Sequence, residues 1–209
     1  MLNVKVRPAA ARVLDPVARF LAGHGVSPDL ITVVGTLGVM GGALGFYPRG
    51  QWFWGTIVVT AFVFSDMLDG AVARVSGRTG VWGAFLDSTL DRFGDAAVFG
   101  GVALFYAGRG HDLLLCTLAL SCLVFGSVTS YIKARAEGLG LRCDVGFAER
   151  SERLVVMLFC TGVSGLLDQD WIRISGLWFL AAATLFTVGQ RVAFVRKQAL
   201  PGPPAVATS

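Results

Sequence analysis

Four aspartates lie within strongly apolar sequence between residues 66 and 91. Asp66 and Asp69 are spaced i, i+3, and Asp87 and Asp91 are spaced i, i+4, so each pair projects from one face of a helix. The intervening residues 75–81 are mostly small or polar and predict a turn. A hairpin would bring the four carboxylates together, and buried carboxylates must be neutralised or bind cations. The pattern therefore predicts a divalent metal cluster.

The sequence around these aspartates is that of a membrane protein. Of its 209 residues, 54% are hydrophobic and 15% are charged, and the mean hydropathy is +0.65. These values exclude an ordinary soluble domain. Apolar runs of about 20 residues, the length that crosses a bilayer, predict an all-α, polytopic membrane protein with six transmembrane helices. They lie at residues 30–47, 52–75, 84–107, 113–134, 154–167 and 172–195.

The two ends of the chain have different compositions. Residues 1–26 alternate basic and apolar positions without the order of a cleaved signal peptide. They predict an amphipathic helix in the membrane interface, with its cations near anionic lipid head groups. A basic segment that only sets topology is the alternative. We expect a single membrane domain over residues 1–197, followed by a disordered tail over residues 198–209.

The distribution of Lys and Arg predicts the orientation in the membrane. With six spans, both termini lie on the same side. Of the 18 basic residues, only Arg49, Arg109 and Arg173 fall on the opposite side in this layout. We therefore expect both termini and the aspartate cluster to face the cytoplasm at the cell membrane. The net charge of +4 reflects this asymmetry, and no nucleic-acid partner is expected.

The aspartate segment resembles the signature of the CDP-alcohol phosphotransferases, which are integral membrane enzymes of phospholipid synthesis. All eight fixed residues of that signature are present: Asp66-x2-Asp69-Gly70-x2-Ala73-Arg74-x8-Gly83-x3-Asp87-x3-Asp91. The resemblance implies transfer of the phosphatidyl group of CDP-diacylglycerol to an alcohol, with release of CMP. It also implies two divalent ions, Mg2+ or Mn2+, bound by the four aspartates, with Asp91 acting in addition as the general base.

A second group of residues matches the nucleotide site of that family. Ser27 and Pro28 favour a helix start, and the family carries a Ser-Pro-Asn/Asp-x-x-Thr segment here that helps to hold the cytidine nucleotide. Capping alone is the alternative. The absence of a side chain at Gly70 would let a diphosphate approach the backbone, and Arg74 lies one turn later. The expected contacts of CDP-diacylglycerol are Asp29, Thr32, Gly70, Arg74, Thr79 and Gly80.

Basic residues at the cytoplasmic ends of the last three spans predict an anion site. Solitary charges inside apolar sequence are costly, and arginine makes bidentate contacts with phosphate. The expected contacts of a phosphorylated acceptor are Ser130, Lys133, Arg135, Arg153 and Arg191. Their segments resemble the actinobacterial phosphatidylinositol phosphate synthases, which implies inositol 3-phosphate as the acceptor. Glycerol 3-phosphate, giving phosphatidylglycerol phosphate, is the second candidate, and charge that only sets topology is the alternative.

Three further interpretations complete the predictions. Carboxylates within the membrane could line the pathway of a cation transporter or channel, but this gives no role to Gly70, Arg74 or Gly83. Asp95 extends the face of Asp87 and Asp91 by one turn, outside the signature, and is expected to pack between helices or to support the site. Small residues in the helices, together with the dimeric state that the resemblance implies, predict a homodimer.

Overall fold

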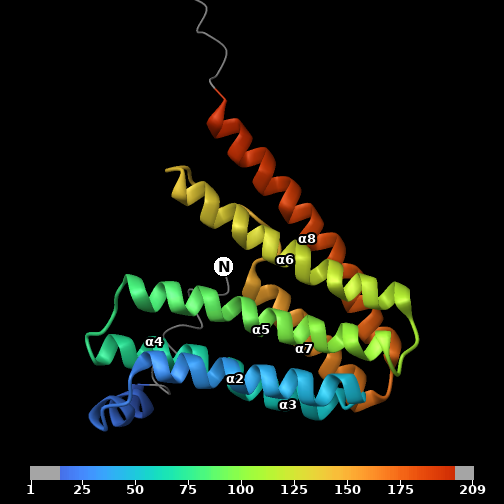
Figure 1. Cartoon of the computed structure of the whole chain (residues 1–209), viewed down its shortest axis with the longest axis horizontal. Helices are drawn as coiled ribbons and strands as arrows, with labels where there is room; N and C mark the ends of the chain where they lie inside the picture. Colours follow the sequence, from blue (N-terminus) through green and yellow to red (C-terminus); the bar gives the residue numbers. More distant parts are fainter. Residues whose placement is uncertain (1–14, 201–209) are drawn as a thin grey trace, which may run out of the picture.

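The computed structural model describes residues 15–200, apart from the side chain of Asp66, and its regular structure there is entirely helical. The all-α prediction is therefore confirmed. Residues 15–23 are helical and are followed by α2 (Pro28–Phe46), the 3-10 turn η1 (Tyr47–Arg49), α3 (Trp52–Val63), α4 (Ser65–Val75), α5 (Val81–Ala107), α6 (Leu113–Gly138), α7 (Arg150–Leu167) and α8 (Asp170–Ala199) (Figure 1).

Side chains that bond to free backbone groups fix several helix starts. Ser27 caps α2, since its Oγ accepts a hydrogen bond from the backbone N–H of Leu30 at 3.2 Å. The carboxylate of Asp112 does the same for α6, with the N–H of Leu115 at 2.9 Å. Glu149 and Glu152 form a reciprocal capping box at the start of α7.

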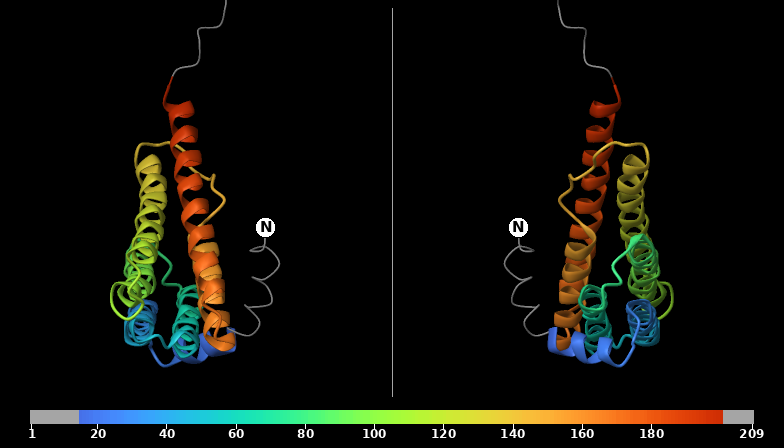
Figure 2. Two further views of the ribbon diagram at one scale, coloured as in Figure 1. Left: turned by 90° about the vertical axis from the view of Figure 1, so that its right-hand side faces the viewer. Right: turned by 90° about the vertical axis from the view of Figure 1, so that its left-hand side faces the viewer.

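The helices form a closed ring around one apolar core. α2 packs against α3 and α5, α5 against α6, α6 against α8, α8 against α7, and α7 against α3. The buried core side chains include Val59, Val98, Met157 and Leu177. Figures 1 and 2 show the helices close together at the end that contains η1 and residues 108–112, whereas α6 and α8 diverge from α4 and α5 at the other end.

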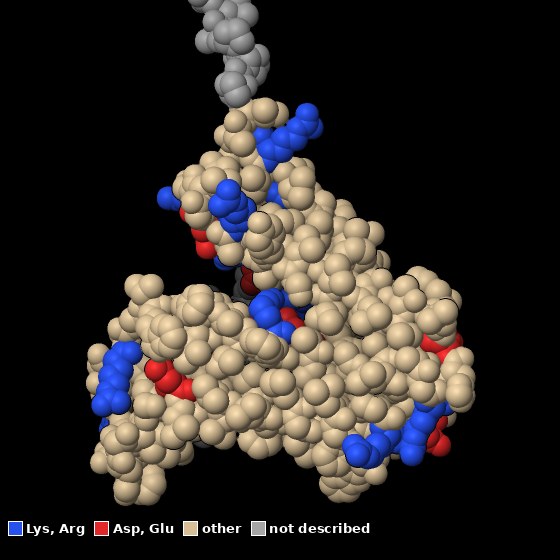
Figure 3. Space-filling view, viewed as in Figure 1, with Lys and Arg blue, Asp and Glu red and all other residues tan. Residues whose placement is uncertain are grey.

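Four segments of the described chain are long and apolar enough to cross a membrane: Pro28–Arg49, Trp52–Val75, Leu113–Gly138 and Asp170–Ala199. The chain is therefore a multi-pass membrane protein. The helices α5 and α7 do not qualify by composition because charged residues interrupt their apolar sequence. Figure 3 shows a broad uncharged surface on one face, with charged side chains near its ends and in one central recess.

The predicted span at residues 52–75 is broken at Phe64 into α3 and α4. The N–H of Met67 bonds to the carbonyl of Phe64 at 3.2 Å, an i→i+3 bond that tightens the backbone at the junction. α2 approaches this junction closely, because a Cβ at Gly35 would lie 3.0 Å from the Cβ of Ser65. The break directly precedes the first aspartate of the signature, so it sets the direction in which α4 presents that motif.

Both ends of the described chain differ in detail from the sequence expectation. Residues 1–14 and 201–209 lie outside the described residues. In the segment 15–23, Ala18 is buried against Ala71 and Val72 of α4, so one face of this expected interfacial helix packs on the protein. Gln198, expected in a disordered tail, belongs to α8 and binds the backbone of Arg142 through both amide atoms, at 2.7 and 3.2 Å.

A buried arginine joins the helices at the end where they converge. Arg173 of α8 is 1% exposed. Its guanidinium donates hydrogen bonds to the hydroxyl of Tyr106 at 3.0 Å, the hydroxyl of Ser164 at 3.0 Å and the carboxylate of Asp170 at 2.8 Å. It also lies 3.9 Å from the centroid of the Trp52 ring. The charge is thus compensated by residues of four helices.

We expect Arg173→Met to lower the free energy of unfolding by about 3 kcal/mol, because it leaves buried polar groups unpaired. Thermal unfolding of the purified protein in detergent measures the effect. Arg109→Met is the matched control, because Arg109 is exposed and donates only to the carbonyl of Arg49 among the described contacts. Equal melting temperatures for the two variants would contradict this role of Arg173.

Candidate active site

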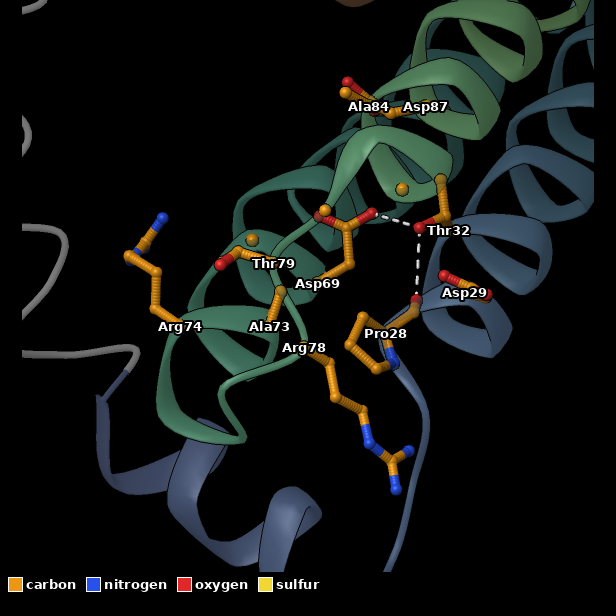
Figure 4. Close-up of a pocket in the computed structure, with 13 residues that line it drawn as sticks. Pro28, Asp29, Thr32, Asp69, Ala73, Arg74, Arg78, Thr79, Ala84 and Asp87 are labelled. Carbon is orange, nitrogen blue, oxygen red and sulfur yellow. Dashed lines mark hydrogen bonds between the residues drawn. The ribbon is translucent and has the colours of Figure 1, made fainter.

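A cavity of about 290 Å³ lies at the diverging end of the bundle, between α2, α4 and α5. Its walls come from the start of α2, the second half of α4, the following turn and the start of α5. The lining residues are Pro28, Asp29, Thr32, Asp69, Gly70, Ala73, Arg74, Arg78, Thr79, Gly80, Gly83, Ala84 and Asp87 (Figure 4). The cavity thus gathers two aspartates of the signature and every residue predicted to contact CDP-diacylglycerol.

The cavity differs from the expected hairpin in the way its helices pack. The sequence predicted that the helices bearing the two aspartate pairs would face each other directly. In the structure, α4 and α5 both pack against α2, and the cavity occupies the space between them. The small residues of the signature keep this space open: the nearest atom to a Cβ at Gly70 would be Nη1 of Arg74, at 3.4 Å, and a Cβ at Gly83 would meet nothing within 4 Å.

Asp69 is held in place by a residue from another helix. Its side chain is buried, with 7% exposure, and its Oδ2 accepts a hydrogen bond from Oγ1 of Thr32 at 2.5 Å. Figure 4 shows this bond between the two side chains in the lining of the cavity. Thr32 also lies 3.1 Å from the carbonyl of Pro28, one turn earlier in α2. The nucleotide segment and the metal motif are therefore physically connected.

The structure distributes the four signature aspartates over different surroundings. Asp69 and Asp87 line the cavity. Asp91 lies one turn further along α5 and pairs with Nη1 of Arg150 at 2.7 Å. The side chain of Asp66 is outside the described part of the structure, and the side chains that are described include no group of three or more His, Cys, Asp or Glu arranged to hold an ion. The four-aspartate metal cluster stays a prediction.

The chemistry of the donors nevertheless suits a hard divalent cation. Carboxylate oxygens of α4 and α5 face one cavity, with hydroxyl groups of Thr32 and Thr79 also in its lining. Mg2+ and Mn2+ prefer such oxygen ligands, and His and Cys, the usual ligands of softer metals, are absent from this lining.

One lining residue, Arg78, and one residue bonded to the lining, Trp82, were not predicted from the sequence. Arg78 lines the cavity (Figure 4), although the sequence indicated only that this residue belongs to the basic cytoplasmic side. Trp82 stands at the rim, where its indole N–H donates a hydrogen bond to Oδ2 of Asp29 at 3.0 Å. This bond joins the starts of α2 and α5. Both residues lie inside the x8 spacer of the signature. That position was the feature of the sequence that could have identified them.

The predicted acceptor residues are gathered only in part. Arg153 and Arg191 are buried, with 2% and 4% exposure, whereas Arg135 is exposed. Lys133 pairs with the carboxylate of Asp144 at 3.3 Å, and Ser130 accepts a hydrogen bond from another helix. The two buried arginines thus form the core of this cluster, while the two residues at the end of α6 lie nearer to solvent.

Arg153 and Arg191 hold the loop before α7 in place. Arg191 donates hydrogen bonds to the carbonyls of Thr129 and Val145, both at 2.7 Å. Arg153 donates to the carbonyl of Ala148 at 3.1 Å. A Cβ at Gly146 would lie 3.2 Å from Nε of Arg191, so the loop packs tightly on this guanidinium. These arginines therefore have a structural role in addition to any contact with a ligand.

Arg92, Asp95 and Arg150 also belong to this cluster, although the sequence did not assign them to a binding site. Arg92 donates to Oγ of Ser130 at 2.6 Å, and both Arg92 and Arg150 pair with Asp95. The sequence signals were the i, i+3 spacing of Arg150 and Arg153 and the continuation of the aspartate face to residue 95. Neither sequence signal predicts that Arg92 and Arg150 both pair with Asp95.

Comparisons with known proteins agree with this geometry. Residues 25–189 match the CDP-alcohol phosphatidyltransferase family. The phosphatidylinositol phosphate synthase of Streptomyces avermitilis is 52% identical over 204 residues, covering 95% of this chain and 84% of the relative. The corresponding synthase of Cutibacterium acnes is 45% identical over 199 residues, covering 91% of this chain and 96% of the relative.

Solved structures of the phosphatidylinositol phosphate synthase of Mycobacterium tuberculosis share the fold. The crystal structure with CDP-DAG bound gives a TM-score of 0.85 at 45% identity, covering 88% of this chain and 94% of that chain. The crystal structure in complex with manganese and citrate gives a TM-score of 0.85 at 44% identity, covering 90% of each chain.

The bond between Thr32 and Asp69 can be tested directly. Thr32→Val keeps the shape of the side chain but removes the hydroxyl donor, so we expect the affinity for Mn2+ to fall about tenfold, as is usual when a metal ligand loses its supporting hydrogen bond. Titration of the detergent-purified protein followed by electron paramagnetic resonance measures it. Thr36→Val, the same change one turn along α2 and outside the cavity lining, should bind Mn2+ like the unchanged protein. Unaltered affinity in Thr32→Val would refute the supporting role.

Proposed function

The chain belongs to the CDP-alcohol phosphatidyltransferase family, and from this premise we propose that it transfers the phosphatidyl group of CDP-diacylglycerol to inositol 3-phosphate, releasing CMP and forming phosphatidylinositol phosphate. The observation that carries the proposal is the cavity, where signature residues of α4 and α5 meet the nucleotide segment of α2. The identity of 52% with a phosphatidylinositol phosphate synthase supports the choice of acceptor.

The aspartates of the signature would hold the metal. We assign Asp66, Asp69, Asp87 and Asp91 to two divalent ions, Mg2+ or Mn2+. Bound ions of this kind neutralise a diphosphate and stabilise the departing CMP. The carboxylates that line the cavity support this assignment, as does the relative that was crystallised with manganese.

The cavity walls suit the nucleotide end of the donor. Asp29 and Thr32 would contact the cytidine moiety from α2, and the turn would contribute Thr79 and Gly80. Gly70 leaves room for the diphosphate, and the guanidinium of Arg74 can bind its oxygens. Val81 and Phe85, beside the cavity at the start of α5, are 89% and 59% exposed. They offer an apolar path by which the two acyl chains can reach the lipid.

We assign Asp91 the role of general base for the acceptor. As general base it takes the proton of the acceptor hydroxyl, whose oxygen then bonds to the phosphorus of the phosphatidyl group. The bond from that phosphorus to the CMP oxygen breaks, and CMP leaves with the electron pair. The ion pair with Arg150, at 2.7 Å, fixes the carboxylate of Asp91 on the side of α5 that meets the acceptor cluster.

The acceptor phosphate would bind the basic cluster. We assign its contacts to Ser130, Lys133, Arg135, Arg153 and Arg191. Buried guanidinium groups in a membrane protein are costly unless anions compensate them, and a phosphate supplies that compensation where a neutral polyol does not. Arg153 and Arg191 bind carbonyls through some of their N–H groups, and each guanidinium has five such donors.

We also propose six membrane spans, with both termini and the site facing the cytoplasm. Helices α5 and α7 have 27 and 18 residues, about the length needed to cross a bilayer, and each lies within the ring of apolar helices.

The proposed homodimer has one local support. Gly41 and Gly45 are spaced i, i+4 on α2, and a Cβ at either would meet nothing within 4 Å, so a second copy could approach there. Cross-linking in native membranes that yields only monomer would rule it out.

The metal assignment predicts the effect of one substitution. Asp87→Asn should lower CMP release from CDP-diacylglycerol at least a hundredfold, since it removes a charged ligand beside the reacting phosphates. Asp112→Asn is the control: Asp112 caps α6 at the converging end, and Asn is an equally good cap. Full turnover in Asp87→Asn, or undiminished turnover of the unchanged protein in excess chelator, would disprove the assignment.

The acceptor assignment predicts a substrate preference. Purified protein in mixed micelles is offered CDP-diacylglycerol with inositol 3-phosphate, glycerol 3-phosphate, free inositol or serine, and CMP release is compared. We expect inositol 3-phosphate to give the highest turnover and free inositol almost none, because a neutral polyol supplies no anion for those N–H donors of Arg153 and Arg191 that the described part of the protein leaves unused. Preference for glycerol 3-phosphate would change the product to phosphatidylglycerol phosphate. Preference for free inositol or serine would show that the arginines only set topology.

A further inference from the structure

Asp95 is a buried carboxylate that contacts three arginines. It lies on α5, one turn after Asp91, and is 4% exposed. Its Oδ1 accepts a hydrogen bond from Nε of Arg150 at 3.2 Å. Its Oδ2 lies 3.5 Å from Nη2 of Arg153 and 3.5 Å from Nη1 of Arg92. Asp95 is outside the family signature, and the proposed reaction assigns it no role.

The three arginines connect Asp95 with both parts of the site. Arg92 donates a hydrogen bond to Oγ of Ser130 at 2.6 Å, and its Nη2 lies 3.7 Å from Oδ2 of Asp91. Arg150 pairs with Oδ1 of Asp91 at 2.7 Å. Arg153 is itself one of the proposed acceptor contacts. A single carboxylate therefore connects the proposed base with the group that would bind the acceptor phosphate.

Helix packing alone is a poor explanation for this arrangement. Three guanidinium groups close together repel one another, and the repulsion grows where water is scarce. A buried ionic cluster contributes little net stability compared with apolar side chains of the same volume. What it does provide is a fixed geometry, because each guanidinium has its orientation set by a directional bond. The transfer reaction needs such a geometry, since the acceptor hydroxyl must meet the base.

We propose that Asp95 is a positioning residue for the acceptor half of the reaction. It orients Arg153 toward the acceptor phosphate and Arg92 toward Ser130, and through Arg150 and Arg92 it holds the carboxylate of Asp91 where the acceptor hydroxyl arrives. The inference rests on the proposed function, because it assumes that a phosphorylated acceptor binds this cluster. Asp95 is not expected to affect the nucleotide pocket, because it is not among the residues that line that pocket.

The test separates donor kinetics from acceptor kinetics in Asp95→Asn. We expect the KM for the phosphorylated acceptor to rise about tenfold and kcat to fall about tenfold, the size of effect that misplaced reacting groups produce. The KM for CDP-diacylglycerol should change by less than about twofold, an expectation that follows from the separate cavity. A residue that only stabilises the fold would not divide the two KM values in this way.

Asp170→Asn is the control. It also removes a carboxylate from a buried arginine, Arg173, at the opposite end of the bundle, although Asp170 itself is exposed. Both of its KM values should equal those of the unchanged protein. An altered acceptor KM in Asp95→Asn and not in Asp170→Asn supports positioning, and an equal change in both variants contradicts it.

Two further variants test each connection separately. Arg92→Gln should raise the acceptor KM and also lower kcat, because Arg92 contacts both Ser130 and Asp91. Arg150→Gln should mainly lower kcat, because Arg150 connects Asp95 with Asp91. The double variant Arg92→Gln/Asp95→Asn should change the acceptor KM by less than the two single variants together predict, because both substitutions break the same connection. If Asp95→Asn does not yield folded protein, the division of effects between Arg92→Gln and Arg150→Gln decides the question.

The outcomes distinguish this inference from the proposed function. Unchanged kinetics in Asp95→Asn, or equal rises in both KM values, would overturn the positioning role while the proposed reaction stands. Turnover of the unchanged protein with glycerol 3-phosphate in place of inositol 3-phosphate would overturn the proposed function. The comparison of KM values between Asp95→Asn and the unchanged protein could then be made with glycerol 3-phosphate and would still test the role of Asp95. Turnover with serine or free inositol alone would overturn both.

Discussion

Charged groups in a membrane protein need partners, because burial removes them from water, and this constraint organises the two ends of the bundle. At the converging end, Arg173 is compensated by a carboxylate, two hydroxyl groups and an aromatic ring. At the diverging end, carboxylates and arginines occur in larger numbers. There the helices leave space for a cavity, and the substrates and ions would complete the charge balance. In this account, the end where the charge of Arg173 is compensated acts as the scaffold, and the other end is the proposed site.

Helix α5 links the two halves of that site. Asp87, Asp91 and Asp95 are spaced i, i+4 along it, so they lie on one face at successive turns. Asp87 lines the nucleotide cavity, Asp91 pairs with Arg150, and Asp95 contacts three arginines. With the proposed assignments, a rigid helix sets the distance between the donor, the base and the acceptor. Such positioning is a large part of the catalysis of a transfer between two bound substrates.

The sequence was informative where local pattern decides the structure. Apolar runs predicted the helices, and the aspartate spacing predicted that Asp69 and Asp87 would face one site. It failed where contacts between distant segments decide. The break at Phe64 lies inside a continuous apolar run, and the packing of α4 on α2 depends on the close approach at Gly35. No binding role was predicted for Arg92 and Arg150, because only the tertiary structure identifies Asp95 as their partner.

The most direct test is a structure of the protein with Mn2+, CDP-diacylglycerol and inositol 3-phosphate bound, using a slowly reacting variant such as Asp91→Asn. The account predicts anomalous scattering from manganese beside Asp69 and Asp87. It also predicts the acceptor phosphate in contact with Arg153 and Arg191, with Asp95 still bonded to Arg92 and Arg153. An acceptor phosphate bound elsewhere, with Arg153 and Arg191 contacting only protein groups, would contradict it.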